Sequence, residues 1–313
     1  MHSTEIISQP LLSILIPTYN REKDLRRLLA VVIPFVERTC DVELIVSNNG
    51  SVDGTAAFIE SLEENPRIRI VNQPIGYGVH IHLGWIYGQA RGRFLWMIGD
   101  DDMVESTLME RVCGILRAEP ELGWIHLPHR FIGLDKPVNS PCPPEVQRIA
   151  KGREIFPSHL RWIAFVTANV IRSSGVHTSL PKLRFNHSFW PMTLLTMATA
   201  ELPAMILNEC KIEGGLEITW KDEVSEISNF HLPIAIFESP VFTIEEQRAA
   251  LLVHYTSQPE YLDRLIFLRP SLLLRIFRRC PKLCSLSFVG RVIKKVWFRI
   301  TGSRLSGSPP KQD

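Results

Sequence analysis

The first 133 residues alternate between short apolar segments and amphipathic segments, and this alternation constrains the fold most strongly. Apolar, β-branched runs predict strands at residues 11–19, 42–49, 68–73, 93–99 and 123–132. Apolar residues at helical spacing predict helices at residues 22–36, 53–64, 78–90 and 106–120. Strand–helix alternation of this kind is typical of an α/β fold with a doubly wound, mostly parallel sheet.

Local signals place the ends of two of these helices. Asp53 is the expected N-cap of the second helix, because its carboxylate can accept a hydrogen bond from a free backbone N–H. Thr107 and Glu110 have the spacing of a capping box, and Pro120 ends the fourth helix.

The chain changes character after residue 133. Residues 134–145 (LDKPVNSPCPPE) carry four prolines and predict a loop or linker. Residues 150–250 mix short predicted strands, at 164–172 and 204–212, with a helix near residues 188–200. We therefore predict boundaries that separate residues 1–133, 134–255, 256–305 and 306–313, the last part being disordered.

Composition limits the class of protein. The chain has 313 residues, 45% of them apolar and 22% charged, as expected for a folded globular protein. No apolar run approaches a membrane span, and the N-terminus lacks the basic start of a signal peptide. The six cysteines lack zinc-site spacing, so we expect free thiols in a reducing cytoplasm.

Polar residues follow four predicted strands at their carboxyl ends, where open parallel sheets bind ligands. They lie in the segments Pro17–Glu22, Ser47–Thr55, Asn72–Gln73 and Asp100–Asp102. Three adjacent aspartates need water, protonation or a cation, and Mg²⁺ or Mn²⁺ suits carboxylates combined with phosphate oxygens. The alternative is a solvated acidic loop in which Asp102 caps the next helix. The matching polar turns favour a metal on a nucleotide diphosphate, with Gly99 leaving room for the nucleotide.

Three of these segments, SILIPTYNR, SNNGSVDGT and GRFLWMIGDDD, resemble successive signatures of the family 2 glycosyltransferases. The resemblance covers about residues 11–130 and is strongest to bacterial enzymes that build lipopolysaccharide and other surface glycans. It implies the GT-A nucleotide-diphospho-sugar transferase fold. It also implies inverting transfer of a hexosyl or deoxyhexosyl group, with Mg²⁺ or Mn²⁺, to a saccharide acceptor that can be lipid-linked. Residues 1–133 would bind the donor and residues 134–255 the acceptor.

The resemblance also implies roles for individual residues. The nucleotide-sugar would contact Pro17, Thr18, Tyr19, Arg21, Asn48, Asn49, Asp53 and Asp100, and the metal would contact Asp101 and Asp102. Asn48 and Asn49 stand where the family usually has two aspartates; an amide oxygen still accepts a base N–H but adds no charge. Asp53 can serve either the nucleotide or its helix. His80 and His82 are expected to be helix residues and not ligands.

The catalytic base is less defined, because no acid lies in the segment RFNHSFWPM, where the family commonly has one. His187 is the titratable group there, and its alternative role is packing or capping. Asp222 and Glu223 are the other candidates. Trp220, in the same segment as these acids, either stacks on a sugar ring or packs in the core.

Two other classes of protein remain open. A nucleotidyltransferase would normally have a basic, glycine-rich phosphate loop after the first strand, which PTYNRE lacks. A non-catalytic binding subunit would agree with the missing acidic base but not with the three aspartates. Nucleic-acid binding is not expected, because the body is acidic and the basic tail has no aromatic-rich sheet.

Charge separates the tail from the body. Residues 1–260 carry 23 basic and 31 acidic residues, whereas Tyr261–Arg304 carries eleven basic residues and one acid. Six apolar residues of the tail recur at helical spacing: Val289, Val292, Ile293, Val296, Trp297 and Ile300. A basic amphipathic helical tail predicts docking on an anionic membrane, here the inner face of the cytoplasmic membrane. The alternative is packing of the same stripe on the acidic body.

Overall fold

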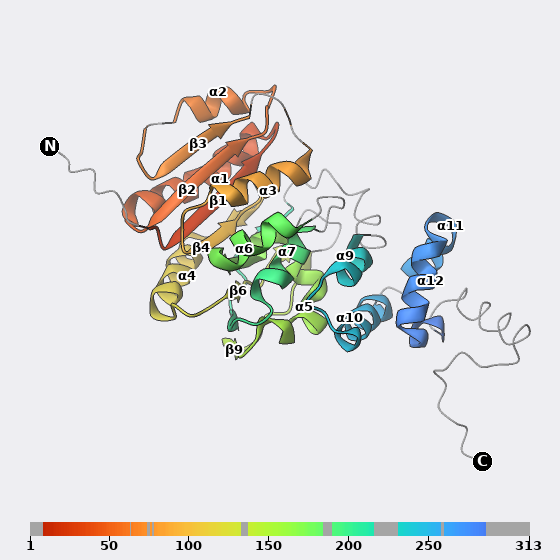
Figure 1. Ribbon diagram of the computed structural model, residues 1–313. Coiled ribbons are helices and arrows are strands. Elements are labelled where there is room, and N and C mark those ends of the chain that lie inside the picture. The colour runs from red at the N-terminus through yellow and green to blue at the C-terminus, as the bar shows by residue number, and fades with distance from the viewer. Residues whose placement is uncertain are drawn as a thin grey trace, which may run out of the picture. The chain divides into compact units, whose positions relative to one another are not determined.

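The structure is a computed structural model of the chain (Figure 1). It describes residues 9–62, 64–73, 76, 78–132, 137–183, 190–215, 231–257 and 260–285. The chain divides into two compact units. Unit 1 consists of Met1–Glu154 with Trp162–Thr219, and unit 2 of Ile155–Arg161 with Trp220–Asp313. The predicted boundaries at residues 133 and 255 concern substrate-binding halves and stay predictions.

Unit 1 is built on an eight-stranded sheet with the strand order β3-β2-β1-β4-β10-β6-β11-β9. The first four strands are parallel and lie side by side in Figure 1: β3 (Ile68–Asn72), β2 (Val42–Asn48), β1 (Leu12–Thr18) and β4 (Phe94–Met97). The other four are β10 (Asn169–Arg172), β6 (Trp124–His126), β11 (Ala204–Ile206) and β9 (Gln147–Ile149). Strand β10 is antiparallel to both of its neighbours, and β9 is antiparallel to β11.

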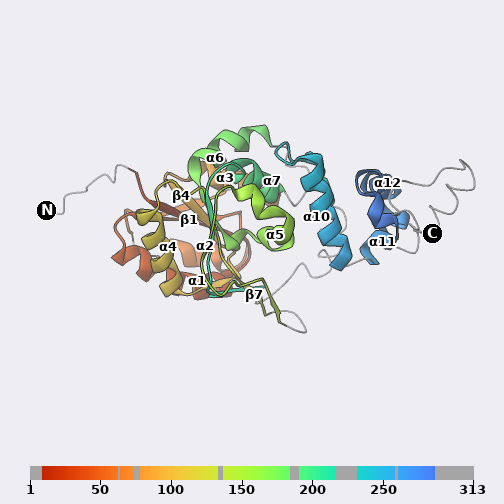
Figure 2. The same ribbon diagram turned by 90° about the horizontal axis from the view of Figure 1, so that it is seen from below.

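Helices cover both faces of this sheet, as the predicted doubly wound α/β fold requires. Helices α1 (Glu22–Arg38) and α4 (Ser106–Ala118) lie on one face, and α3 (Val79–Gln89) lies on the other with α6 (Ser173–Ser179) and α7 (Trp190–Thr199) (Figure 2). Helix α2 (Thr55–Glu60) contacts α1. The burial of β1, β2 and β4 explains their continuous apolar sequence, since both faces are covered.

Two predicted strands are each divided in the structure. Residues 123–132 form β6 and a separate strand β7 (Arg130–Phe131), and residues 204–212 form β11 and the start of β12 (Ile212–Gly214). Strands β7 and β12 belong to a second sheet of order β5-β12-β7-β8, together with β5 (Met103–Val104) and β8 (Val138–Asn139). Strands of two or three residues are too short to produce a periodic pattern, which is why the sequence did not predict them.

The predicted helix caps are displaced by one or two positions. Helix α4 has Glu105 at its N-cap with no side-chain hydrogen bond, so the predicted capping box of Thr107 and Glu110 is wrong. Thr107 Oγ1 instead donates to Glu105 Oε2 at 3.2 Å. Gly54 occupies the N-cap of α2, but Asp53 Oδ1 accepts from the backbone N–H of Thr55 at 2.9 Å and so satisfies the first helical residue.

The remaining described elements are short in unit 1 and mainly helical in unit 2. They are η1 (Gly152–Glu154), α5 (Phe156–Ile163), η2 (Val166–Ala168), η3 (Leu180–Lys182), α9 (Leu232–Glu238), α10 (Ile244–Ser257), α11 (Glu260–Leu268), α12 (Pro270–Arg279) and η6 (Pro281–Ser285). In the part of the chain that the structure describes, no helix has the length and apolar character needed to cross a bilayer.

Candidate functional site

The polar ends of four parallel strands meet at one edge of the large sheet. The register pairs Thr18 with Asn48 and Asn48 with Asn72, so these three residues lie at one level. Strand β4 reaches the same level, because Thr18 Oγ1 donates a 2.7 Å hydrogen bond to Asp100 Oδ2. We call this group of strand ends the carboxyl edge.

Asp100 and Asp101 are the partly accessible carboxylates of the carboxyl edge. Burial raises the pKa of Asp100 to about 6, against the opposing effect of the hydrogen bond from Thr18. Burial also raises the pKa of Asp101, whose Oδ2 lies 3.4 Å from Arg21 Nη1. In both carboxyl groups, the protein contacts that favour the charged form do not fully offset the effect of burial. A bound cation would favour their ionised forms.

Asp102 is buried, whereas its two neighbours are partly accessible. It is 3% exposed, its Oδ2 accepts from Thr167 Oγ1 at 2.5 Å, and its Oδ1 accepts from the backbone N–H of Gly215 at 3.2 Å. The alternative role of Asp102 as a helix cap is wrong, because Glu105 occupies the N-cap of α4 with no side-chain cap bond. The predicted contact of Asp102 with a metal stays a prediction. Gly99 fits against Asp102, since a Cβ on Gly99 would lie 2.7 Å from Asp102 Oδ2.

Arg21 belongs to a short charged network at the start of α1. Its Nη1 lies 3.5 Å from Asp24 Oδ2, and Arg27 Nη2 lies 2.7 Å from Asp24 Oδ1. Arg27 Nη2 also donates to the backbone oxygen of Asp101 at 3.4 Å. Asp24 and Arg27 were not predicted, although the i,i+3 spacing of Arg21, Asp24 and Arg27 indicates such a network.

Asn48 has a structural reason for being an amide. Its Oδ1 accepts from the backbone N–H of Ser51 at 3.0 Å, while its Nδ2 donates to Asn72 Oδ1 at 3.1 Å. An aspartate could accept the first bond but could not donate the second. The neighbouring Asn49 is also buried, and its backbone N–H donates to Thr18 O at 2.9 Å.

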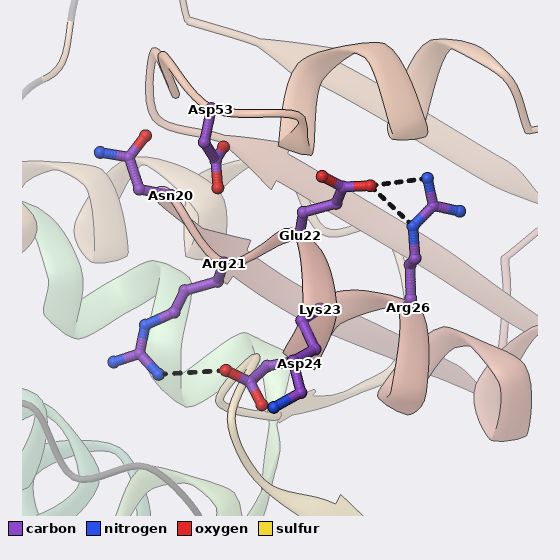
Figure 3. Close-up of a pocket in the computed structure, with 7 residues that line it drawn as sticks. All are labelled: Asn20, Arg21, Glu22, Lys23, Asp24, Arg26 and Asp53. Atoms are coloured by element: carbon purple, nitrogen blue, oxygen red, sulfur yellow. Dashed lines mark hydrogen bonds and ion pairs between the residues drawn. The ribbon is translucent and has the colours of Figure 1, made fainter.

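The other predicted nucleotide contacts lie beside this edge. Pro17 is partly buried at the end of β1, and Tyr19 is 52% exposed. Figure 3 shows an open pocket at the start of α1, lined by Asn20, Arg21, Glu22, Lys23, Asp24, Arg26 and Asp53. His82 was expected to be a helix residue and not a ligand; it is buried in α3, with Nε2 2.7 Å from Ser47 Oγ.

The donor set fits a divalent cation only in part. Among the described residues, no group of three or more His, Cys, Asp or Glu side chains is placed to hold a metal ion. Two adjacent carboxylates, from Asp100 and Asp101, are what Mg²⁺ commonly takes from a protein when phosphate oxygens and water complete its shell. The base candidates His187, Asp222 and Glu223, together with Trp220, lie outside the described residues.

Replacing Asp102 by asparagine is expected to flatten the dependence of the unfolding free energy on pH. Burial raises the pKa of Asp102 to about 8, from 3.8 as its ordinary value. Between these values the folded chain holds a proton that the unfolded chain has lost, so raising the pH lowers the unfolding free energy, by at most ~1.4 kcal/mol per pH unit.

The asparagine cannot titrate, and its single oxygen can satisfy only one of the two donors, so a constant destabilisation is expected at every pH. Urea unfolding between about pH 4 and pH 8, in the presence of a chelator, measures both effects. Parallel profiles for Asp102→Asn and the unaltered chain would contradict the assignment of a raised pKa.

The N-terminal segment is similar to known glycosyltransferases. Residues 13–143 match the family described as glycosyl transferase family 2. Over 127 residues the chain is 28% identical to chondroitin synthase of Pasteurella multocida, covering 40% of this chain and 13% of that protein. Over 94 residues it is 31% identical to abequosyltransferase RfbV of Salmonella typhimurium, covering 29% of this chain and 28% of that protein. The chain thus spans less than a third of the length of each of these relatives.

Solved structures share the fold across most of the chain. TarS residues 1–349 of S. aureus, solved with UDP-GlcNAc, has a TM-score of 0.63 at 11% identity and covers 92% of this chain and 87% of that chain. Mannosyltransferase PcManGT of Pyrobaculum calidifontis, solved with GDP-Man and Mn²⁺, has a TM-score of 0.54 at 13% identity, covering 93% and 88%. The predicted GT-A fold and the resemblance to family 2 glycosyltransferases are confirmed.

Proposed function

We propose that the chain, whose residues 13–143 match glycosyl transferase family 2, transfers a sugar from a nucleotide-diphospho-sugar to a hydroxyl of a saccharide acceptor. The observation that carries this proposal is the pairing of Thr18 with Asp100 and of Arg21 with Asp101 at one sheet edge, inside the matched segment. Relatives that transfer sugars, and a neighbour solved with UDP-GlcNAc, support the donor class.

The described residues suggest separate roles in binding the donor. Thr18 fixes one oxygen of Asp100 by its hydrogen bond, which orients the carboxylate at the carboxyl edge. Arg21 and Arg27 surround Asp101 through its carboxylate and its backbone oxygen, and so limit the conformations of this residue. A bound Mg²⁺ or Mn²⁺ would neutralise charge on the departing nucleotide diphosphate, with Asp100 and Asp101 holding it.

Inversion at the anomeric carbon requires a base that removes the proton of the acceptor hydroxyl during its attack. His187, Asp222 and Glu223 remain the candidates, and the identity of the base is a prediction. We also propose a lipid-linked acceptor in surface-glycan biosynthesis at the cytoplasmic face of the membrane. The basic composition of residues 261–304 supports this place of action.

A panel of nucleotide sugars, tested for binding and for metal-dependent release of the nucleotide diphosphate, tests the proposed function. Release of a nucleoside diphosphate with sugar transfer would support a glycosyltransferase. Release of pyrophosphate from a nucleoside triphosphate would instead indicate the alternative nucleotidyltransferase. Binding of a nucleotide sugar with no turnover under any metal or acceptor condition would indicate the alternative binding subunit.

The full chain is expected to bind vesicles that contain anionic lipid and to release them at high salt. Each basic residue close to an anionic leaflet contributes about 1 kcal/mol, so several of the eleven in residues 261–304 suffice for reversible binding. Co-sedimentation with phosphatidylcholine vesicles, with and without phosphatidylglycerol, measures this. Equal binding to both vesicles would contradict electrostatic docking, and no binding would leave the tail with a packing role.

A further inference from the structure

Unit 2 contains four arginines that line one open pocket. Arg248 comes from α10, and Arg275, Arg278 and Arg279 come from α12. The other lining residues are Phe237 of α9 and Ile244 of α10. We call this group the arginine pocket. It lies entirely within unit 2 and shares no residue with the carboxyl edge of unit 1.

Local contacts hold the guanidinium groups in the arginine pocket. The Cζ atoms of Arg275 and Arg279 lie 4.8 and 5.9 Å from the ring centroid of Phe237, at cation–π distance. Arg248 Nε donates to the backbone oxygen of Arg279 at 2.9 Å, which ties α10 to the end of α12. These contacts orient the cations but neutralise none of them.

Helix α12 divides its side chains sharply between two faces. Leu272, Leu273, Ile276 and Phe277 are buried, and α12 contacts α10 and α11. Leu274, Arg275 and Arg278 are exposed, with Leu274 48% accessible. The apolar face of α12 is thus used inside unit 2, and the opposite face presents arginines beside an exposed leucine. Ile244, also exposed, adds a second apolar side chain at the pocket.

No carboxylate within ion-pair distance of these four arginines exists among the residues that the structure describes. By contrast, the exposed arginines Arg38, Arg117 and Arg148 of unit 1 each pair with an acid. Gathering four guanidinium groups that have no acidic partner among the described residues costs electrostatic free energy unless an anion joins them. Residues 286–313, which follow, add six basic residues and one acid, so the sequence around the pocket stays strongly basic.

We propose that the arginine pocket binds the phosphate groups of anionic phospholipid headgroups and is the site through which unit 2 docks on a membrane. Guanidinium groups bind phosphate by bidentate hydrogen bonds, and the exposed leucine and isoleucine match the acyl boundary below a headgroup. This inference rests on the membrane docking included in the proposed function, and it assigns that docking to specific described residues.

The test compares two doubly substituted full-length chains with the unaltered chain. Arg275→Gln with Arg278→Gln removes two charges from the arginine pocket, and Arg38→Gln with Arg148→Gln removes two exposed charges from unit 1. Partitioning onto phosphatidylglycerol-containing vesicles should fall at least about tenfold for the first variant and change less than about twofold for the control. Circular dichroism and thermal unfolding verify that both variants are folded.

Equal loss of binding in the two variants would overturn the proposal, because only net charge would then matter. It would also be overturned if inorganic phosphate bound the unaltered chain while vesicles containing phosphatidylglycerol did not, since the pocket would then be a site for free phosphate. Sugar transfer to an acceptor in solution should be unchanged by Arg275→Gln with Arg278→Gln. Absence of transfer by the unaltered chain would refute the proposed function without affecting the vesicle comparison.

Discussion

Replacing Asp101 by alanine is expected to remove sugar transfer, with kcat/KM lowered by at least about 10²–10³-fold and the fold preserved. Asp101 lies at the partly accessible carboxyl edge, where the proposed function requires charge on a departing diphosphate to be balanced. Its loss leaves Arg21 close to Asp24, at 3.5 Å, so the charged network at the start of α1 keeps a partner for the arginine. We therefore expect the unfolding free energy to change little.

One further variant separates the charge of Asp101 from its size, and a second serves as a control. Asp101→Asn keeps the size of the side chain and should be as inactive as Asp101→Ala if the carboxylate acts through its charge. Glu110→Gln is the matched control, because Glu110 is also a carboxylate paired with an arginine, Arg38, at 2.7 Å, but lies away from the carboxyl edge. Full activity of Asp101→Ala with a chelator present would contradict both the metal and the donor role.

The parallel half of the fold could be predicted because its signal is local. Strands β1, β2 and β4 are buried on both faces, so each is a continuous apolar run, and polar turn residues mark each end. Once these strands are taken as parallel neighbours, Thr18 and Asp100 must come together, and the structure joins them by a hydrogen bond. The strand order therefore explains why polar residues that are far apart in the sequence lie together at the carboxyl edge.

The position of Asp102 could not be predicted, because its partners are distant in sequence. Thr167 is 65 residues away and Gly215 is 113 residues away. Thr167 lies in the short helix η2 and Gly215 follows the three-residue strand β12, and neither segment has a periodic pattern. Three identical neighbours in the sequence thus acquire different environments: two partly accessible carboxylates and one buried carboxyl group with a strongly raised pKa.

This difference changes how the acidic cluster can act. A site in which all three aspartates faced one cation would need all three ionised. In the structure both carboxyl oxygens of Asp102 accept internal hydrogen bonds. These bonds connect the turn after β4 with η2 and with the residue that follows β12. Asp102 would then act on the donor only indirectly, by fixing the turn that carries Asp100 and Asp101.

Removing the catalytic base is expected to lower kcat by ~10²–10⁴-fold while leaving donor affinity nearly unchanged, because the base acts on the acceptor hydroxyl only during transfer. The variants are His187→Ala, Asp222→Ala and Glu223→Ala, assayed for kcat and, separately, for equilibrium binding of the nucleotide sugar. Glu226→Ala is a matched control, since it removes an acid from the same segment of the chain.

The pH profile of kcat distinguishes the two kinds of base. An unperturbed histidine titrates near ~6.5 and an unperturbed glutamate or aspartate near ~4, so the acidic limb should lie about two pH units higher for His187 than for Asp222 or Glu223. The limb should disappear only in the variant that lacks the true base. If all three variants keep near-normal kcat, none of these residues is the base. A fall in donor affinity of the same size as the fall in kcat would instead assign the residue to donor binding.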